Sequence, residues 1–102
     1  LVAVLESYLS ASHVDQPAQG CALTTLSTEV ARSSVGTREI FERMMIRIKD
    51  ELGAHLADDD QAWAMISQMV GAVIIARAMA SGEARNALLE AVMRQCREMI
   101  DR

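Results

Sequence analysis

Two histidines and two cysteines are the side chains of this sequence best suited to catalysis or metal binding. A zinc site needs three or four nitrogen, sulfur or oxygen ligands at recognisable spacing, whereas Cys21 and Cys96 form no Cys-x-x-Cys pair. The sequence also contains no His-Glu-x-x-His motif, glycine-rich phosphate loop or Gly-x-Ser-x-Gly turn. No pair of side chains stands out for acid–base catalysis. The sequence therefore predicts a protein that is not an enzyme and that holds no metal or cofactor.

Each of these four residues has a structural interpretation. His13 lies in a polar stretch and is expected to be a solvated loop residue. His55 lies beside an apolar helix face, where it is either a residue at the edge of that face or a polar contact inside a cavity. Cys21 and Cys96 are expected to be small buried residues in a reducing, cytoplasmic compartment, and a disulfide between them is the alternative.

Length, composition and charge predict one small domain spanning residues 1–102. A hydrophobic content of 51% in 102 residues can support a modest core. The net charge is −4 and the basic residues are spread along the chain, which argues against nucleic-acid binding by this domain because phosphate neutralisation needs clustered Lys and Arg. One Phe, one Tyr and one Trp offer no platform for stacked bases.

Hydrophobic periodicity predicts an all-α fold, a five-helix antiparallel bundle. The expected helices span residues 1–10, 22–32, 37–57, about 61–80 and 83–101. The helix at 37–57 has the clearest amphipathic pattern, with one apolar face formed by Phe41, Met45, Ile48, Leu52 and Leu56. The acidic run 58–60 should end that helix and cap the next one. Gly82 is expected in the left-handed conformation that often ends a helix.

The segment 63–80 is apolar on two sides, which makes it the most informative part of the chain. All but four of its residues (Ser67, Gln68, Gly71 and Arg77) are Ala, Val, Ile, Met or Trp. At 100° per residue they form one stripe of Met65, Met69, Ala72, Ala76 and Met79, and an opposite stripe of Trp63, Val70, Ile74 and Ala78. A surface helix normally buries one stripe, so the second predicts contact with a partner chain. A membrane span is disfavoured because Arg77 would cost about 3 kcal/mol at the bilayer centre.

Five methionines on the two central helices indicate an apolar region whose side chains can adjust their packing. Methionine is unbranched and polarizable, so it fills irregular gaps and tolerates guests of different shapes. Ordinary core packing is one interpretation of these residues. A cavity for a hydrophobic ligand, with few polar groups in its wall, is the other.

Several segments together resemble the C-terminal domain of tetracycline-repressor (TetR)-type transcriptional regulators. The resemblance begins with Tyr-Leu-Ser at 8–10 and is most distinctive in the loop at 13–23, which contains Pro17 and Gly-Cys-x-Leu. It continues through Thr-Glu-Val-Ala at 28–31, the helix that starts near Phe41, and the apolar run at 70–78. It thus covers nearly the whole chain.

The resemblance implies a homodimeric regulator whose C-terminal domain binds a small, often apolar effector. In this family the last two long helices pair with those of a second subunit in a four-helix bundle. DNA is bound by a separate N-terminal helix-turn-helix domain, which is absent from this sequence. The chain is therefore expected to be part of a longer protein, and not to bind an operator by itself.

Two sets of residues follow from the pattern and the resemblance together. The expected effector-binding residues are Tyr8, Leu26, Val30, Phe41, Met44, Met45, Ile48, Trp63, Ile66 and Val70. The expected dimer-interface residues are Met69, Val73, Ala76, Arg77, Ala80, Leu89, Val92, Cys96 and Met99. Simple core packing is the competing interpretation for both sets.

Three functions remain open on this basis. The first is the effector-binding and dimerisation domain of a transcriptional repressor. The second is a structural, dimeric helical adaptor without a ligand pocket. The third is a free-standing carrier of hydrophobic ligands.

Overall fold

The computed structural model describes residues 1–10, 14 and 29–101, and these contain four helices and no strand. The helices are α1 (Val2–Tyr8), α4 (Val35–Gly53), α5 (Asp59–Ala78) and α6 (Gly82–Asp101). The predicted all-α class is confirmed. Most of the helix expected at 22–32 lies outside the described residues.

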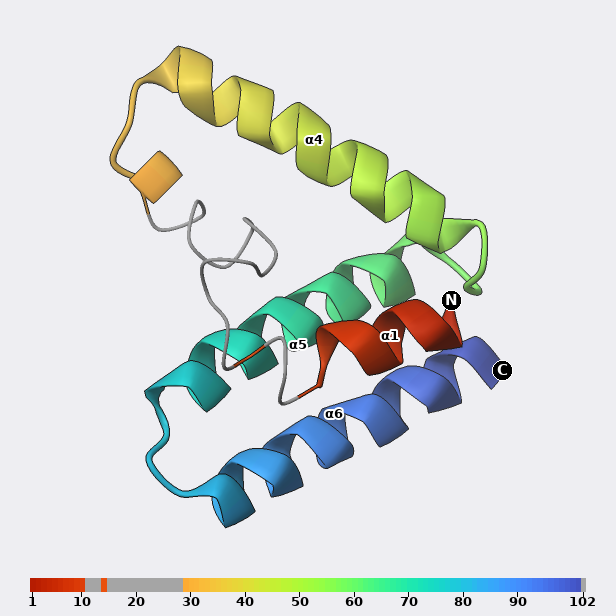
Figure 1. Ribbon diagram of the computed structural model, residues 1–102. Coiled ribbons are helices and arrows are strands. Elements are labelled where there is room, and N and C mark those ends of the chain that lie inside the picture. The colour runs from red at the N-terminus through yellow and green to blue at the C-terminus, as the bar shows by residue number, and fades with distance from the viewer. Residues whose placement is uncertain (11–13, 15–28, 102) are drawn as a thin grey trace.

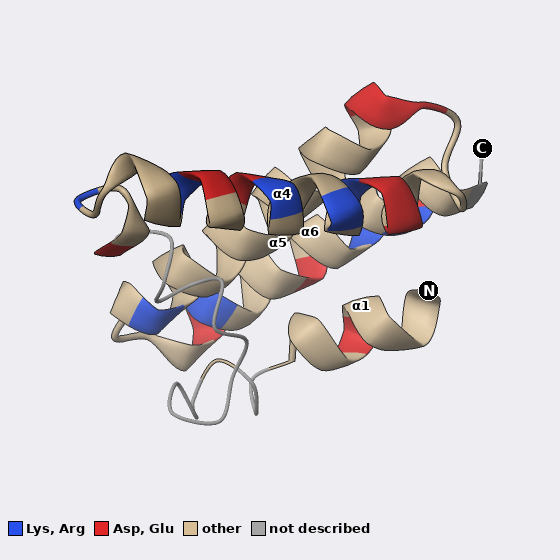
Figure 2. Cartoon of the chain, turned by 90° about the horizontal axis from the view of Figure 1, so that it is seen from above, with Lys and Arg blue, Asp and Glu red and all other residues tan. Residues whose placement is uncertain are grey.

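Helices α1, α5 and α6 lie side by side, and α4 lies across α5 (Figure 1). α5 and α6 form an antiparallel hairpin, and α1 runs alongside them in the same direction as α5. The ribbon of α4 meets α5 near the turn at 54–58 and diverges from it toward the N-terminal end of α4. Basic and acidic residues are interspersed along α4 (Figure 2).

The hydrophobic core lies between α1, α5 and α6. Seven residues of α5 are buried, and they fall on one stripe because they recur every three or four positions. Leu5 and Leu9 of the N-terminal segment, Val14, and Leu89 and Cys96 of α6 complete this core. None of the 19 residues of α4 is fully buried.

The start of α5 is set by Asp58, as the acidic run predicted. The Asp58 carboxylate accepts a hydrogen bond from the Gln61 amide at 2.9 Å. The Gln61 side chain in return accepts one from the Ala57 amide at 3.2 Å. The first of these bonds satisfies an amide that the first turn of a helix leaves without a partner, and the second fixes the residue before the cap.

Ser34 caps α4 in a similar way, by accepting a hydrogen bond from the Thr37 amide at 3.3 Å. Residues 33–36 were expected to interrupt the helical pattern. Instead Ser34 begins α4, and Val35 and Gly36 belong to its first turn. A serine hydroxyl is a favourable helix cap, so the polar residues set the boundary two residues earlier than the apolar pattern indicated.

The predicted role of Gly82 is wrong. No described glycine has a positive φ angle, and Gly82 opens α6 rather than closing α5. Helix α5 ends at Ala78 because Met79 adopts an extended conformation with φ −90° and ψ 137°. The Ser81 hydroxyl then accepts a hydrogen bond from the Ala84 amide at 3.3 Å, which caps α6.

Candidate functional site

An apolar cavity of about 60 Å³ lies where α1, α4 and α5 meet. Its walls are formed by Tyr8 of α1, Ile48 and Leu52 of α4, and Ile66, Met69 and Val70 of α5. The Tyr8 hydroxyl is the one polar side-chain group among these six residues. We call this space the narrow cavity.

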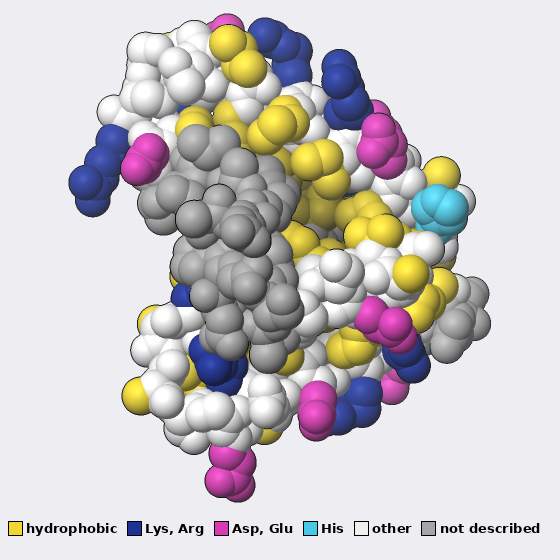
Figure 3. All heavy atoms as spheres, in the orientation of Figure 1, with side chains coloured by type: hydrophobic (Ala, Val, Ile, Leu, Met, Phe, Trp, Pro, Cys, Tyr) yellow, Lys and Arg dark blue, Asp and Glu magenta, His cyan; other side chains and the backbone are white. Residues whose placement is uncertain are grey.

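A second, wider hollow of about 340 Å³ lies toward the N-terminal end of α4. Its lining residues are Val30, Ala31, Arg38, Phe41, Glu42 and Met45. Apolar side chains fill the hollowed surface beneath α4 in the space-filling view (Figure 3). The two spaces lie beside the same face of α4, and we call the second one the wide hollow.

Lys49 attaches the C-terminal half of α4 to the start of α5. Its ammonium lies 2.6 Å from a carboxylate oxygen of Asp50 and 3.2 Å from one of Asp59, and its side chain is only 12% exposed. The same ammonium lies 5.8 Å from the centre of the Trp63 ring, within the range of a cation–π contact. The hydrogen bonds that its ammonium donates to Asp50 and, with a smaller effect, to Asp59 raise the pKa of Lys49. The contact with Asp59 therefore attaches α4 to the first turn of α5.

Seven of the ten expected effector-binding residues line these two spaces. Tyr8, Ile48, Ile66 and Val70 border the narrow cavity, and Val30, Phe41 and Met45 border the wide hollow. Met44 and Trp63 are exposed and border neither, while Leu26 lies outside the described residues. Sequence reasoning did not place Leu52 at the cavity, and it assigned Met69 to the dimer interface instead.

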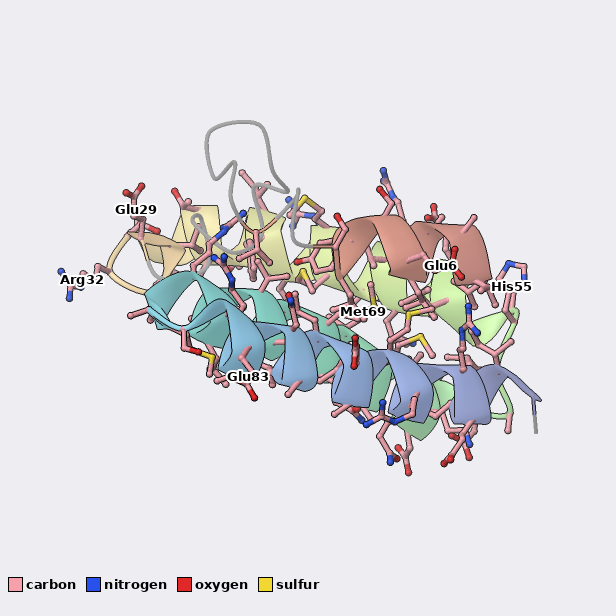
Figure 4. All side chains as sticks on the ribbon, turned by 60° about the horizontal axis from the view of Figure 1, so that its bottom comes forward. Glu6, Glu29, Arg32, His55, Met69 and Glu83 are labelled. Carbon is pink, nitrogen blue, oxygen red and sulfur yellow. The ribbon has the colours of Figure 1, made fainter. Side chains whose placement is uncertain are left out.

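Five of the nine expected interface residues lie in the core of the single chain. These are Met69, Val73, Ala76, Leu89 and Cys96. Met69 points between the helices toward the middle of the bundle (Figure 4). Arg77, Val92 and Met99 are half-buried, and Ala80 is exposed. Their contact with a second subunit stays a prediction, but a partner docking on this arrangement would meet other residues of α5 first.

The outer face of α5 carries those other residues. Ile74 is 42% exposed, Ile75 53% and Trp63 40%, and Ala64 and Ala78 are exposed beside them. Three of these residues, Trp63, Ile74 and Ala78, belong to the second stripe recognised in the sequence. The structure thus buries four of the five residues of the first stripe in the chain's own core, all but Met79, and leaves part of the second stripe on the surface. We call this surface the α5 outer face.

Arg77, the one charged residue in the apolar part of α5, contacts the chain's own backbone. Its Nε donates a hydrogen bond to the Val14 carbonyl oxygen at 3.4 Å. Val14 itself is only 2% exposed and packs in the core. Arg77 therefore attaches Val14 to α5, because a half-buried guanidinium is stabilised by an oxygen acceptor.

A third space is a groove of about 220 Å³ between α1 and α6, which the sequence did not predict. Its lining residues are Glu6, Leu9, Asn86, Leu89, Glu90 and Met93. Glu6 forms an ion pair with Arg97 of α6. This exposed pair holds α1 against α6, and exposed pairs of this kind contribute at most about 1 kcal/mol.

The structure resolves the two interpretations of His55. It is exposed in the turn after α4 and points away from the bundle (Figure 4), so it is not a polar contact inside either space beneath α4. Cys96 is a buried free thiol whose pKa is raised by burial, in agreement with its expected role as a small core residue. His13 and Cys21 lie outside the described residues.

Searches among protein-family models, curated proteins and solved structures found no match to this chain. Within the described part of the chain, no three His, Cys, Asp or Glu residues gather where they could hold a metal ion. The helices at 2–8, 35–53, 59–78 and 82–101 include none that is long and apolar enough to cross a lipid bilayer.

Proposed function

We propose that this chain is the effector-binding and dimerisation domain of a TetR-like transcriptional repressor that acts in the cytoplasm. A small apolar effector bound beneath α4 would alter operator binding by an N-terminal helix-turn-helix domain outside this sequence. The observation that carries the proposal is the double role of α5. One side of this helix lines the narrow cavity, and another side forms an exposed apolar surface.

The wall of the narrow cavity supports binding of an apolar effector. Ile66, Met69 and Val70 of α5 face Ile48 and Leu52 of α4 across it. A largely apolar wall with very few polar groups is typical of sites for hydrophobic small molecules. Met69 adds adaptability, since its unbranched side chain can adjust to guests of different shapes.

The α5 outer face supports dimerisation. Ile74 and Ile75 are exposed on a helix whose neighbours on that side, Ala64, Gly71 and Ala78, are small. Small residues let a second helix approach closely, and exposed large apolar side chains gain free energy when they leave water. The occupant proposed for this face is a second copy of the chain, whose hairpin of α5 and α6 would complete a four-helix arrangement.

Because α5 contributes to both the effector site and the proposed dimer interface, it can couple effector binding to the arrangement of the two subunits. A ligand that favours one position of α5 relative to α4 would favour one arrangement of the two subunits as well. It can shift that equilibrium only by its different affinity for the two arrangements, typically about 1–3 kcal/mol of coupling. Subunit spacing matters to a repressor because paired recognition helices must meet half-sites about one DNA turn apart.

The first test is the solution mass of the chain across a dilution series. The wild-type chain should be a dimer that dissociates on dilution. The dimer dissociation constant of the Ile75→Glu variant should be at least about tenfold higher than that of wild type. Val35→Glu is the matched control, because Val35 is 59% exposed on α4 and the substitution makes the same change of charge. A wild-type chain that is monomeric at every concentration, or equal effects of the two substitutions, would contradict the dimer.

The second test is binding of Nile red, a neutral dye that fluoresces in apolar surroundings. Wild type should bind it, and Val70→Trp, which fills the narrow cavity, should weaken binding by at least about tenfold. Val35→Glu serves as the control, because Val35 is exposed on α4 and lines neither space. Unaltered binding by the Val70→Trp variant would remove the cavity from the proposal.

A second candidate function is a dimeric helical adaptor without a ligand pocket. The observation that favours it is the volume of the narrow cavity, about 60 Å³, since small-molecule sites usually measure about 300–1,000 Å³. An adaptor would still dimerise through α5 but would bind no Nile red. The two measurements above therefore separate the two functions.

A further inference from the structure

The narrow cavity and the wide hollow lie along one ridge of α4. Phe41 and Met45 border the wide hollow, and Ile48 and Leu52 border the narrow cavity. These positions follow the i, i+4, i+7, i+11 spacing of a single helix face. At 1.5 Å per residue the ridge extends for roughly 16 Å from Phe41 to Leu52. The two spaces therefore follow one another along α4, and the narrow cavity is the one nearer the turn after α4. We refer to them together as the space beneath α4, with a wide end and a narrow end.

Charged side chains line only the wide end of this space, where one positive and one negative residue give no net charge. Among the residues that line the two spaces, Arg38 and Glu42 are the charged ones. They lie four positions apart on α4, so they are neighbours on its surface. A ligand with a net charge of either sign would meet one attractive and one repulsive side chain there. A neutral group that both donates and accepts hydrogen bonds would suit both.

Lys49 of α4 is engaged with side chains that line neither space. The ammonium of Lys49 is held by Asp50 and Asp59 and lies over the Trp63 ring. The lining of the narrow end consists of five aliphatic or thioether side chains and Tyr8. A charged group placed there would be disfavoured, because it would lose its hydration without gaining a charged partner. The narrow end therefore suits the apolar end of a ligand.

We propose that the space beneath α4 binds an uncharged, elongated apolar molecule, such as a long-chain alcohol or amide. The molecule lies along the ridge from Phe41 to Leu52, with its polar end beside Arg38 and Glu42 and its chain end in the narrow cavity near Tyr8. This inference rests on the proposed function and names the chemical class of its effector.

The experiment is displacement of Nile red by two matched series of straight-chain compounds at neutral pH, alcohols and carboxylates, below their micelle concentrations. Alcohols should displace the dye with affinity that rises with chain length and levels off once the chain reaches roughly 16 Å, the length of the ridge. Carboxylates of equal length should bind at least about tenfold more weakly.

Two variants make the test specific. Glu42→Gln removes the side chain that repels a carboxylate. The tenfold difference in affinity between alcohols and carboxylates should therefore fall to about threefold or less. Glu39→Gln makes the same change of charge at an exposed residue of α4 that lines neither space, and it should leave this difference unchanged. Both residues are exposed on α4, so neither substitution should disturb folding.

Each outcome decides one proposal. If Nile red does not bind at all, the proposed function itself fails. If the dye binds but carboxylates equal or exceed alcohols, or if Glu42→Gln and Glu39→Gln behave alike, the inference about ligand class is overturned while the proposed function stands. Affinity that does not depend on chain length would likewise overturn the placement along the ridge.

Discussion

Helices α4 and α5 have nearly the same length but are held in the molecule by different forces. Seven residues of α5 are buried, whereas none of α4 is. α5 packs in the core with α1 and α6, while α4 presents a half-buried apolar face and is attached near its C-terminal half by Lys49. The comparison teaches that stability resides mainly in α5, and that α4 is free to take part in binding.

The largest expected effect contrasts one methionine on each helix. Met65→Ala on α5 should lower the free energy of unfolding by about 2–5 kcal/mol, since it removes a fully buried side chain and leaves a cavity. Met45→Ala on α4 should cost about 1 kcal/mol or less, because Met45 is only half-buried. Urea unfolding followed by circular dichroism measures both. Equal losses of unfolding free energy for the two variants would contradict the view that α5 is more important than α4 for stability.

The helix caps give the second test. Asp58→Ala should lower the free energy of unfolding by about 1 kcal/mol, because it removes the hydrogen bond to the Gln61 amide at the start of α5. Ser34→Ala removes the corresponding bond to the Thr37 amide in α4. There we expect faster amide hydrogen exchange in the first turns of α4, with a smaller change in global stability. A global loss after Ser34→Ala as large as that after Asp58→Ala would show that α4 belongs to the cooperative core.

Gly71 allows a substitution that should stabilise the chain. A Cβ atom built at Gly71 meets nothing within 4 Å, so Gly71→Ala should gain about 0.5–1 kcal/mol through lower backbone entropy in the unfolded state. The measurement is urea unfolding in an Ile75→Glu background, which separates the monomer's stability from dimerisation. A loss of stability there would mean that the α5 outer face is covered by the chain itself.

The smallest expected effect concerns the Lys49 attachment. The pKa of Lys49 is raised in the folded chain by its hydrogen bonds to Asp50 and Asp59, so its contribution to stability is fully present below its ordinary pKa of about 10.4 and is lost as pH rises through the folded value. Trp63 reports this change, because it is the only Trp and lies beside the ammonium. Its fluorescence should shift above about pH 10.4 in wild type. Lys49→Met should abolish that shift, and persistence of the shift would assign it to another group.

The sequence predicted the start of α5 and its two stripes well because the signals there are local. The Asp58 cap depends on residues within one turn, and the two apolar stripes follow directly from helix geometry. What the pattern could not decide was which stripe faces the chain's own core. Both contain large apolar residues, so the interface was placed on Met69, Val73 and Ala76, which the structure buries within one chain.

The end of α5 was predicted wrongly for a related reason. Glycine and serine next to each other are compatible with a helix end and with a helix start. At positions 81 and 82 the serine hydroxyl caps α6, while the glycine keeps an ordinary negative-φ conformation. The local pattern identified the break between α5 and α6. It did not determine whether the glycine would end α5 or whether the serine would cap α6.

The candidate site was predicted in part because its α4 side is one periodic face. Phe41, Met45 and Ile48 were chosen from that face, and they border the two spaces. Trp63 was chosen as a large aromatic residue, but its ring lies beneath Lys49 instead. A contact of this kind depends on how two helices cross, which residue spacing within each helix does not determine.

The most direct test of the central claim, that α5 serves both the effector site and a partner subunit, is the dimer dissociation constant with and without saturating Nile red. Sedimentation equilibrium gives both values. The proposed function predicts that the dye changes the constant by at least about fivefold, the lower end of typical coupling between linked sites. It also predicts that the Val70→Trp substitution removes this change. A dissociation constant that stays the same while the dye is bound would contradict the claim.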